Sequence, residues 1–86
     1  MFEQETVIQN PTGLHARPAA QLSAFCKSFP NEISVSSGER KANPKSIFSL
    51  LGGCFKKGET VRVHVEGEDA EQVGKAIVSF IESLEE

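Results

Sequence analysis

The chain has 86 residues and carries 9 basic against 12 acidic side chains, for a formal net charge of −3. A chain of this length has room for one hydrophobic core, so residues 1–86 are expected to form a single domain. The acidic balance argues against nucleic acid as the main partner. No apolar run reaches membrane-spanning length and the first residues are acidic rather than basic, so we expect no membrane insertion, no signal peptide and a cytoplasmic protein.

A strand, a loop and a helix are predicted for the first third of the chain. Residues 2–8 alternate imperfectly between apolar and polar side chains, which favours a strand, and residues 10–13 form a loop by composition. A helix is expected over 16–27. Its apolar residues recur at helical spacing and would face a core: Ala19, Leu22, Cys26 and Phe29. This spacing predicts that Cys26 is a buried structural cysteine, and we expect both it and Cys54 to be free thiols.

The middle of the chain predicts a hairpin followed by a short helix. Residues 32–36 alternate cleanly, and 40–43 would be the short return strand after a tight turn. Ser46 is a natural N-cap for a helix over 47–51, and Gly52–Gly53 are expected to close it.

The apolar residues of this short helix do not fit one stripe. Ile47, Leu50 and Leu51 share a face, whereas Phe48 lies off to the side. Part of the helix is therefore expected to be exposed, and exposed apolar surface on a small protein usually serves docking.

The last part of the chain predicts a strand and a helix. Residues 60–66 alternate most clearly, with three valines on one face and His64 on the opposite, solvated face. Asp69 with Gln72 resembles a capping box at the start of the last helix. A regular apolar stripe follows, formed by Val73, Ile77, Phe80, Ile81 and Leu84.

The predicted element order is β-α-β-β-α-β-α. Alternating strands imply a sheet with one solvated and one covered face, so the sheet should be mainly antiparallel with the helices stacked on one side. The predicted fold class is a two-layer α+β sandwich.

The strongest candidate site lies where the first loop becomes a helix. Gly13 allows a tight turn, and Pro18 suits the first turn of a helix. His15 would then lie at the helix N-terminus beside the free amides of Ala16 and Arg17, which bind anions and phosphate above all. The Arg17 guanidinium can also fork onto phosphoryl oxygens. These features together suggest a phosphate carried on His15.

Other sites are weaker. Nothing in the sequence places His64 near His15, so a two-histidine metal site has no support, and no cofactor motif is present. Ser46 is most simply an N-cap. A phosphate there would gain from the helix dipole, yet add roughly two negative charges to an apolar docking surface, and the sequence leaves such regulation open.

Residues 13–20 match at every position the histidine phosphorylation signature of the HPr phosphocarrier family of the bacterial sugar phosphotransferase system. The chain resembles that family over essentially its whole length. The resemblance implies an open-faced β-sandwich, with a four-stranded antiparallel sheet covered by three helices. It also implies that His15 accepts phosphate on Nδ1 from phosphorylated enzyme I and passes it to enzyme IIA domains. Ser46 matches the position that a dedicated serine kinase phosphorylates in many Gram-positive members, although Gly53 and Cys54 depart from the family's pattern nearby.

No catalytic base accompanies His15, so the chain is expected to be a phosphoryl carrier and not an enzyme. The candidate docking residues for enzyme I and enzyme IIA are Ala20, Ile47, Phe48 and Leu51. The alternative is a regulatory protein of the same fold, whose Ser46-phosphorylated form binds a transcription regulator or an enzyme. A third interpretation is a small ligand-binding domain in which His15 is only a helix cap. In each case we expect a monomer without metal or cofactor.

Overall fold

The computed structural model describes residues 1–86 and contains four strands and three helices in the predicted order. The strands are β1 (Phe2–Val7), β2 (Ile33–Ser37), β3 (Arg40–Ala42) and β4 (Thr60–Val65). The helices are α1 (Ala16–Lys27), α2 (Ile47–Gly53) and α3 (Ala70–Ser83). The predicted β-α-β-β-α-β-α order is therefore confirmed.

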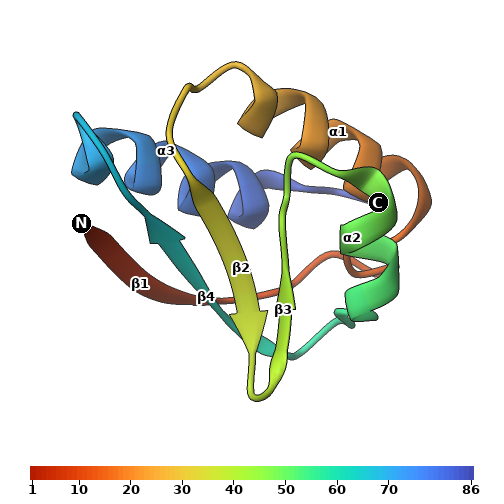
Figure 1. Ribbon diagram of the computed structural model, residues 1–86. Coiled ribbons are helices and arrows are strands. Elements are labelled where there is room, and N and C mark those ends of the chain that lie inside the picture. Colours follow the sequence, from red (N-terminus) through yellow and green to blue (C-terminus); the bar gives the residue numbers. More distant parts are fainter.

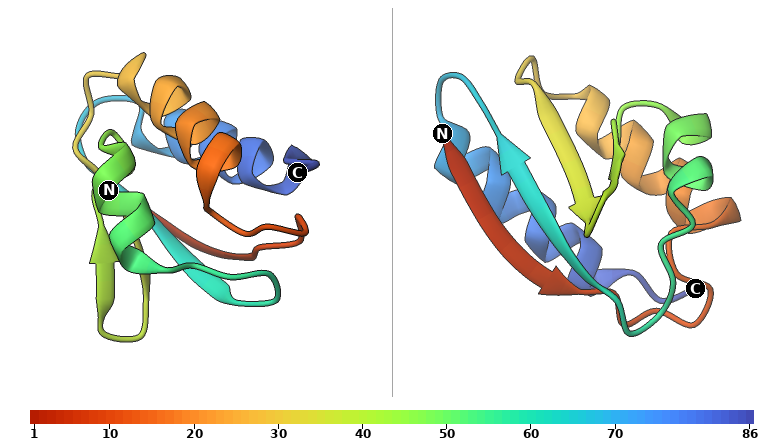
Figure 2. Two further views of the ribbon diagram at one scale, coloured as in Figure 1. Left: turned by 90° about the vertical axis from the view of Figure 1, so that its right-hand side faces the viewer. Right: turned by 60° about the horizontal axis from the view of Figure 1, so that its bottom comes forward.

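The strands form one antiparallel sheet in the order β1-β4-β2-β3. The clearly alternating strand, β4, lies inside the sheet, where His64 pairs with Glu3 of β1 on one side and Ser34 of β2 on the other. Figure 1 shows α1 and α3 lying across one face of the sheet, with α2 at its edge beside β3. The views in Figure 2 separate this helical layer from the sheet, whose other face is left open. The predicted two-layer α+β sandwich is confirmed.

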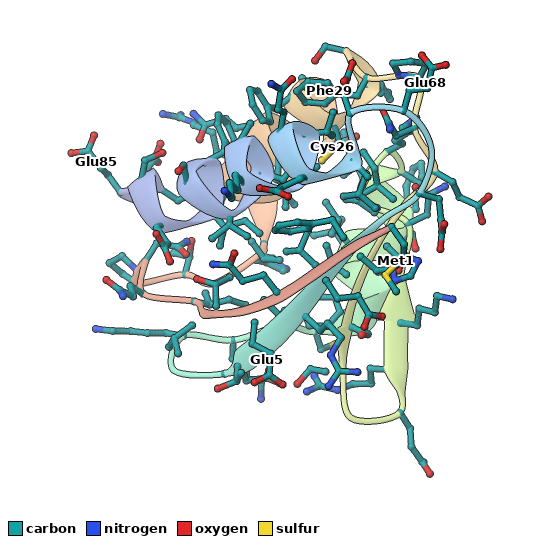
Figure 3. The ribbon with its side chains drawn as sticks, turned by 90° about the vertical axis from the view of Figure 1, so that its left-hand side faces the viewer. Met1, Glu5, Cys26, Phe29, Glu68 and Glu85 are labelled. Carbon is teal, nitrogen blue, oxygen red and sulfur yellow. The ribbon has the colours of Figure 1, made fainter.

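The core lies between the sheet and the helices, because each strand turns its apolar side chains toward the helical layer. It contains 19 buried apolar residues: Phe2, Ile8, Leu14, Ala19, Leu22, Cys26, Ile33, Val35, Ala42, Leu50, Phe55, Val61, Val63, Val65, Ala70, Val73, Ile77, Val78 and Ile81. Figure 3 shows Cys26 on the helical side and Glu5 on the opposite side of the sheet. Cys26 is fully buried and free, as predicted, and this burial raises the pKa of its thiol to about 12.

A smaller aromatic cluster extends the core between the two long helices. Phe25 stacks on Phe80 with ring centroids 4.4 Å apart and meets Phe29 edge-on at 5.3 Å. Phe29, Phe80 and Leu84 were predicted to face the core and are only partly buried. None of the helices is long and apolar enough to cross a membrane.

Two predicted helix ends are wrong. Gly53 belongs to α2, and the residue in the left-handed conformation that ends the helix is Cys54, at φ 52°. Gly53 is required for space, because a Cβ there would strike the Phe55 ring. At the start of α3, Asp69 makes no side-chain cap bond, so the predicted capping box with Gln72 does not form.

Candidate functional site

His15 is the N-cap of α1, as predicted, with extended backbone at φ −133° and ψ 159°. The first helical hydrogen bond runs from the Ala19 amide to the His15 carbonyl, at 3.4 Å. The amides of Ala16 and Arg17 precede it and have no acceptor within the protein. The His15 side chain is exposed and makes no capping bond of its own. An anion beside the imidazole would therefore find unpaired donors at the positive end of a helix.

The loop before His15 is held against the protein at several points. Gly13 has φ 66°, and its amide and carbonyl bond to the backbone and side chain of Asn10 at 3.1 and 2.7 Å. The Leu14 amide donates to the Phe55 carbonyl at 3.0 Å, and the Leu14 side chain is buried in the core. With Pro18 buried on the other side, an exposed histidine is carried on anchored backbone.

Arg17 binds a partner that sequence reasoning missed. Its Nη1 lies 3.2 Å from Oε2 of Glu86, and both side chains are at least half exposed, at 71% and 50%. The Glu86 carbonyl in turn accepts from the Thr12 amide at 2.8 Å and from the Thr12 hydroxyl. Both views in Figure 2 place the C-terminus beside the loop before α1. No local pattern signals this contact, because the two residues are 69 positions apart.

His64 lies on the other side of the molecule from the helical layer. On the open face of the sheet its Nδ1 is 2.8 Å from Glu3, and its Nε2 meets Glu66. These hydrogen bonds, first to Glu3 and then to Glu66, raise the pKa of His64. The structure does not bring His64 to His15, and no group of three or more potential metal ligands is assembled anywhere in the chain.

Helix α2 places Ser46 and an apolar surface next to α1. The Ser46 hydroxyl accepts the Ser49 amide at 3.2 Å, so the predicted N-cap is confirmed. Leu50 is buried and attaches the helix to the core. Phe48 is 87% and Ile47 37% exposed. Four exposed or half-buried residues on these contacting helices form what we call the α1–α2 surface: Ala20, Ile47, Phe48 and Leu51.

Comparison with known proteins shows the family to which the chain belongs. The family described as PTS HPr component phosphorylation site matches residues 2–83. The phosphocarrier protein HPr of Lysinibacillus sphaericus is 37% identical over 98% of this chain and 96% of its own length. The HPr-like protein Crh of Halalkalibacterium halodurans is 34% identical over 95% of this chain and 98% of its own.

Among solved structures, HPr-C-His from Thermoanaerobacter tengcongensis is similar with a TM-score of 0.91 and 40% identity. The match covers 96% of this chain and 93% of that one. Sequence and fold similarity thus extend over almost the whole chain. The chain belongs to the HPr family of phosphocarrier proteins of the phosphotransferase system.

Proposed function

We propose that this phosphocarrier takes a phosphoryl group on His15 from phosphorylated enzyme I and donates it to enzyme IIA proteins in sugar uptake. The family makes the chain a relay carrier without catalytic activity of its own. One observation carries the specific role of His15. Its side chain is exposed and free of hydrogen bonds at a helix N-terminus whose first amides have no acceptor.

In this relay a lone pair on Nδ1 of His15 attacks phosphorus while the bond from phosphorus to the donor breaks. The ring keeps its proton on Nε2, and the group leaves again when an acceptor attacks in turn. Phosphoryl transfer asks mainly for positioning and charge stabilisation, so a carrier needs no acid or base of its own. The amides of Ala16 and Arg17 and the Arg17 guanidinium would hold the phosphoryl oxygens.

The α1–α2 surface is the proposed docking site for both partners. Phe48 and Ile47 are among the few large apolar side chains of the protein that are exposed. They lie on a helix that contacts α1, which carries His15 at its start. Donor and acceptor would use this surface in turn, as a transient interface under about 1,200 Å² allows. We also propose that residues 1–86 act as one domain, because all seven elements pack on one core, and that the protein is a monomer.

The decisive experiment uses phosphoenolpyruvate and enzyme I. The protein should gain one acid-labile phosphoryl group that is lost in His15→Ala and retained in His64→Ala. The second variant is a matched control, since it removes the other histidine of the chain. The proposal fails if no competent enzyme I phosphorylates the protein, or if the group survives in His15→Ala.

A second function is favoured by the surroundings of Ser46. This serine caps α2 directly before Ile47 and Phe48, so a phosphate on it would place charge at the edge of the α1–α2 surface. A serine kinase would add the phosphate, and the modified form would bind a transcription regulator. An acid-stable, ATP-dependent phosphoryl group that is absent from Ser46→Ala would support this role. Its absence with every HPr serine kinase tested would leave the histidine relay alone.

A further inference from the structure

The loop that carries His15 rests on the segment from Gly53 to Glu59. Leu14 donates its amide to the Phe55 carbonyl at 3.0 Å. Gly13 approaches so closely that a Cβ on it would lie 2.5 Å from the same carbonyl oxygen. The Phe55 ring is buried and lies against Gly53 at the end of α2. The loop before His15 thus contacts this segment at the Phe55 carbonyl, which accepts the Leu14 amide, and at the adjoining backbone of Lys56.

Arg40, on the edge strand β3, binds both sides of Phe55. Its Nη1 donates to the carbonyls of Gly53 and Cys54 at 2.9 and 3.0 Å. The same guanidinium pairs with the Glu59 carboxylate, and its carbon lies 5.4 Å from the centre of the Phe55 ring. One side chain therefore contacts the segment before, at and after Phe55.

Glu59 binds the same segment from the other side, and we call the Arg40–Glu59 pair with its contacts the brace. It accepts the Lys56 amide at 2.8 Å and the Ser37 hydroxyl at 3.1 Å in addition to Arg40. The hydrogen bond from Arg40 lowers the pKa of the Glu59 carboxyl, so the pair stays charged near neutral pH. The brace also spans Cys54, whose backbone at φ 52° is held in a conformation that a residue with a Cβ rarely adopts.

We propose that Arg40 is a positioning residue for phosphoryl transfer. Together with Glu59 it fixes the segment from Gly53 to Glu59, and through the Phe55 carbonyl it sets where Leu14 and His15 stand when a partner docks. This role rests on the proposed relay through His15. It matters because a displacement of the reacting atom by about 1 Å can cost on the order of a hundredfold in rate.

The first test measures phosphorylation of the carrier by phospho-enzyme I as a function of carrier concentration. In Arg40→Gln we expect kcat to fall about tenfold while KM changes less than about twofold, because the docking surface is untouched. Arg40→Lys should restore kcat to within about threefold, since an ammonium still reaches Glu59 and one carbonyl. Glu59→Gln keeps the carbonyl bonds and should have an intermediate effect. Arg62→Gln is the matched control, because it removes the ion pair with Glu5 on the same sheet.

The second test measures hydrogen exchange of the Leu14 amide, which reports the bond to Phe55 directly. We expect about tenfold faster exchange in Arg40→Gln than in the unsubstituted protein and no change in Arg62→Gln. A normal kcat in folded Arg40→Gln and Glu59→Gln would overturn the positioning role alone. A rise in KM without a fall in kcat would also overturn it. If the unsubstituted protein accepted no phosphoryl group, the relay itself would be refuted, and the transfer role of Arg40 with it.

Discussion

Replacing Gly13 by alanine tests whether the loop before His15 rests on rigid backbone. At φ 66° any residue with a Cβ adopts a left-handed conformation, which costs about 1–2 kcal/mol. The new Cβ would also lie 2.5 Å from the Phe55 carbonyl oxygen and 2.9 Å from Cα of Lys56. Both are backbone atoms, so relief of the overlap must move the chain, at a further cost of about 1–3 kcal/mol. We therefore expect Gly13→Ala to lower the free energy of unfolding by about 2–5 kcal/mol.

Gly38→Ala isolates the steric part of this cost. Gly38 has φ 61°, but a Cβ there would meet nothing within 4 Å, so only the conformational cost of about 1–2 kcal/mol applies. Thermal unfolding followed by circular dichroism compares the two, with about 4–8 °C expected for each kcal/mol in a domain of this size. Gly13→Ala should lose about twice as much Tm as Gly38→Ala or more, and it alone should slow phosphorylation of His15. Equal losses of Tm would refute the reasoning, because the segment under Gly13 would then yield freely.

Three further predictions concern the surface of the protein. Phe48→Ser should raise the KM for enzyme I about tenfold, as expected for an apolar anchor at an interface, and leave Tm unchanged because the ring is 87% exposed. Val7→Ser, at an exposed apolar residue of β1, should leave that KM unaltered, and a similar rise there would contradict the docking site. Glu86→Gln should increase the equilibrium fraction of phosphorylated protein about two- to fivefold, because Arg17 is released from a competing carboxylate. Quantitative mass spectrometry at fixed donor concentration measures this, and a decrease would show that Glu86 supports the phosphorylated state. Protonated His64 binds two carboxylates, so its contribution to stability is present below its unfolded-state pKa of about 6.5 and is lost as pH rises through the higher folded-state pKa. Urea unfolding between about pH 6 and 8 should show this decline, of less than about 1 kcal/mol, in the parent and not in His64→Gln.

Local patterns predicted those parts of the structure that local interactions decide. The alternating valines of β4 face the core and His64 faces away, because a strand has only two faces and only one is covered. The start of α1 was also predicted correctly from the local sequence. Gly13 takes the positive φ that its turn requires, and His15 is the N-cap. Ser46 behaves as the N-cap that its position before an apolar run indicated.

Predictions failed where a distant residue decides the local geometry. Two glycines in succession usually end a helix, yet α2 includes both, and Gly53 serves instead to leave room for the Phe55 ring. The left-handed position consequently falls on Cys54, which no propensity favours. Asp69 has the right sequence for a capping box, but its own φ of 56° is incompatible with the extended N-cap conformation that such a box uses.

The contacts of Arg17 and Arg40 could not be predicted from the sequence for the same reason. Arg17 meets Glu86 across 69 positions, and Arg40 meets Glu59 across 19. Both pairs depend on how the last residues and the segment after α2 come to lie beside the loop before His15. The periodicity of a helix or strand in the sequence does not indicate which distant segments come into contact. The sequence patterns therefore proposed His15 and Arg17 as site residues, and they did not predict the Arg17–Glu86 and Arg40–Glu59 contacts.

The start of α1 is an unfavourable helix terminus as it stands. Its first residue, Ala16, has φ 46°, a conformation that costs a residue with a Cβ about 1–2 kcal/mol. Its first turn contains a cation, Arg17, and no acidic residue, although the helix dipole favours negative charge there. Glu86 offsets part of this imbalance from outside the helix. In the proposed relay, a phosphoryl group on His15 would supply the missing negative charge and accept hydrogen bonds from the unpaired amides, and it would thus complete the terminus. Because Glu86 would remain available to Arg17 when the group departs, the gain on phosphorylation would be limited, and a limited gain is what a carrier requires in order to pass the group on.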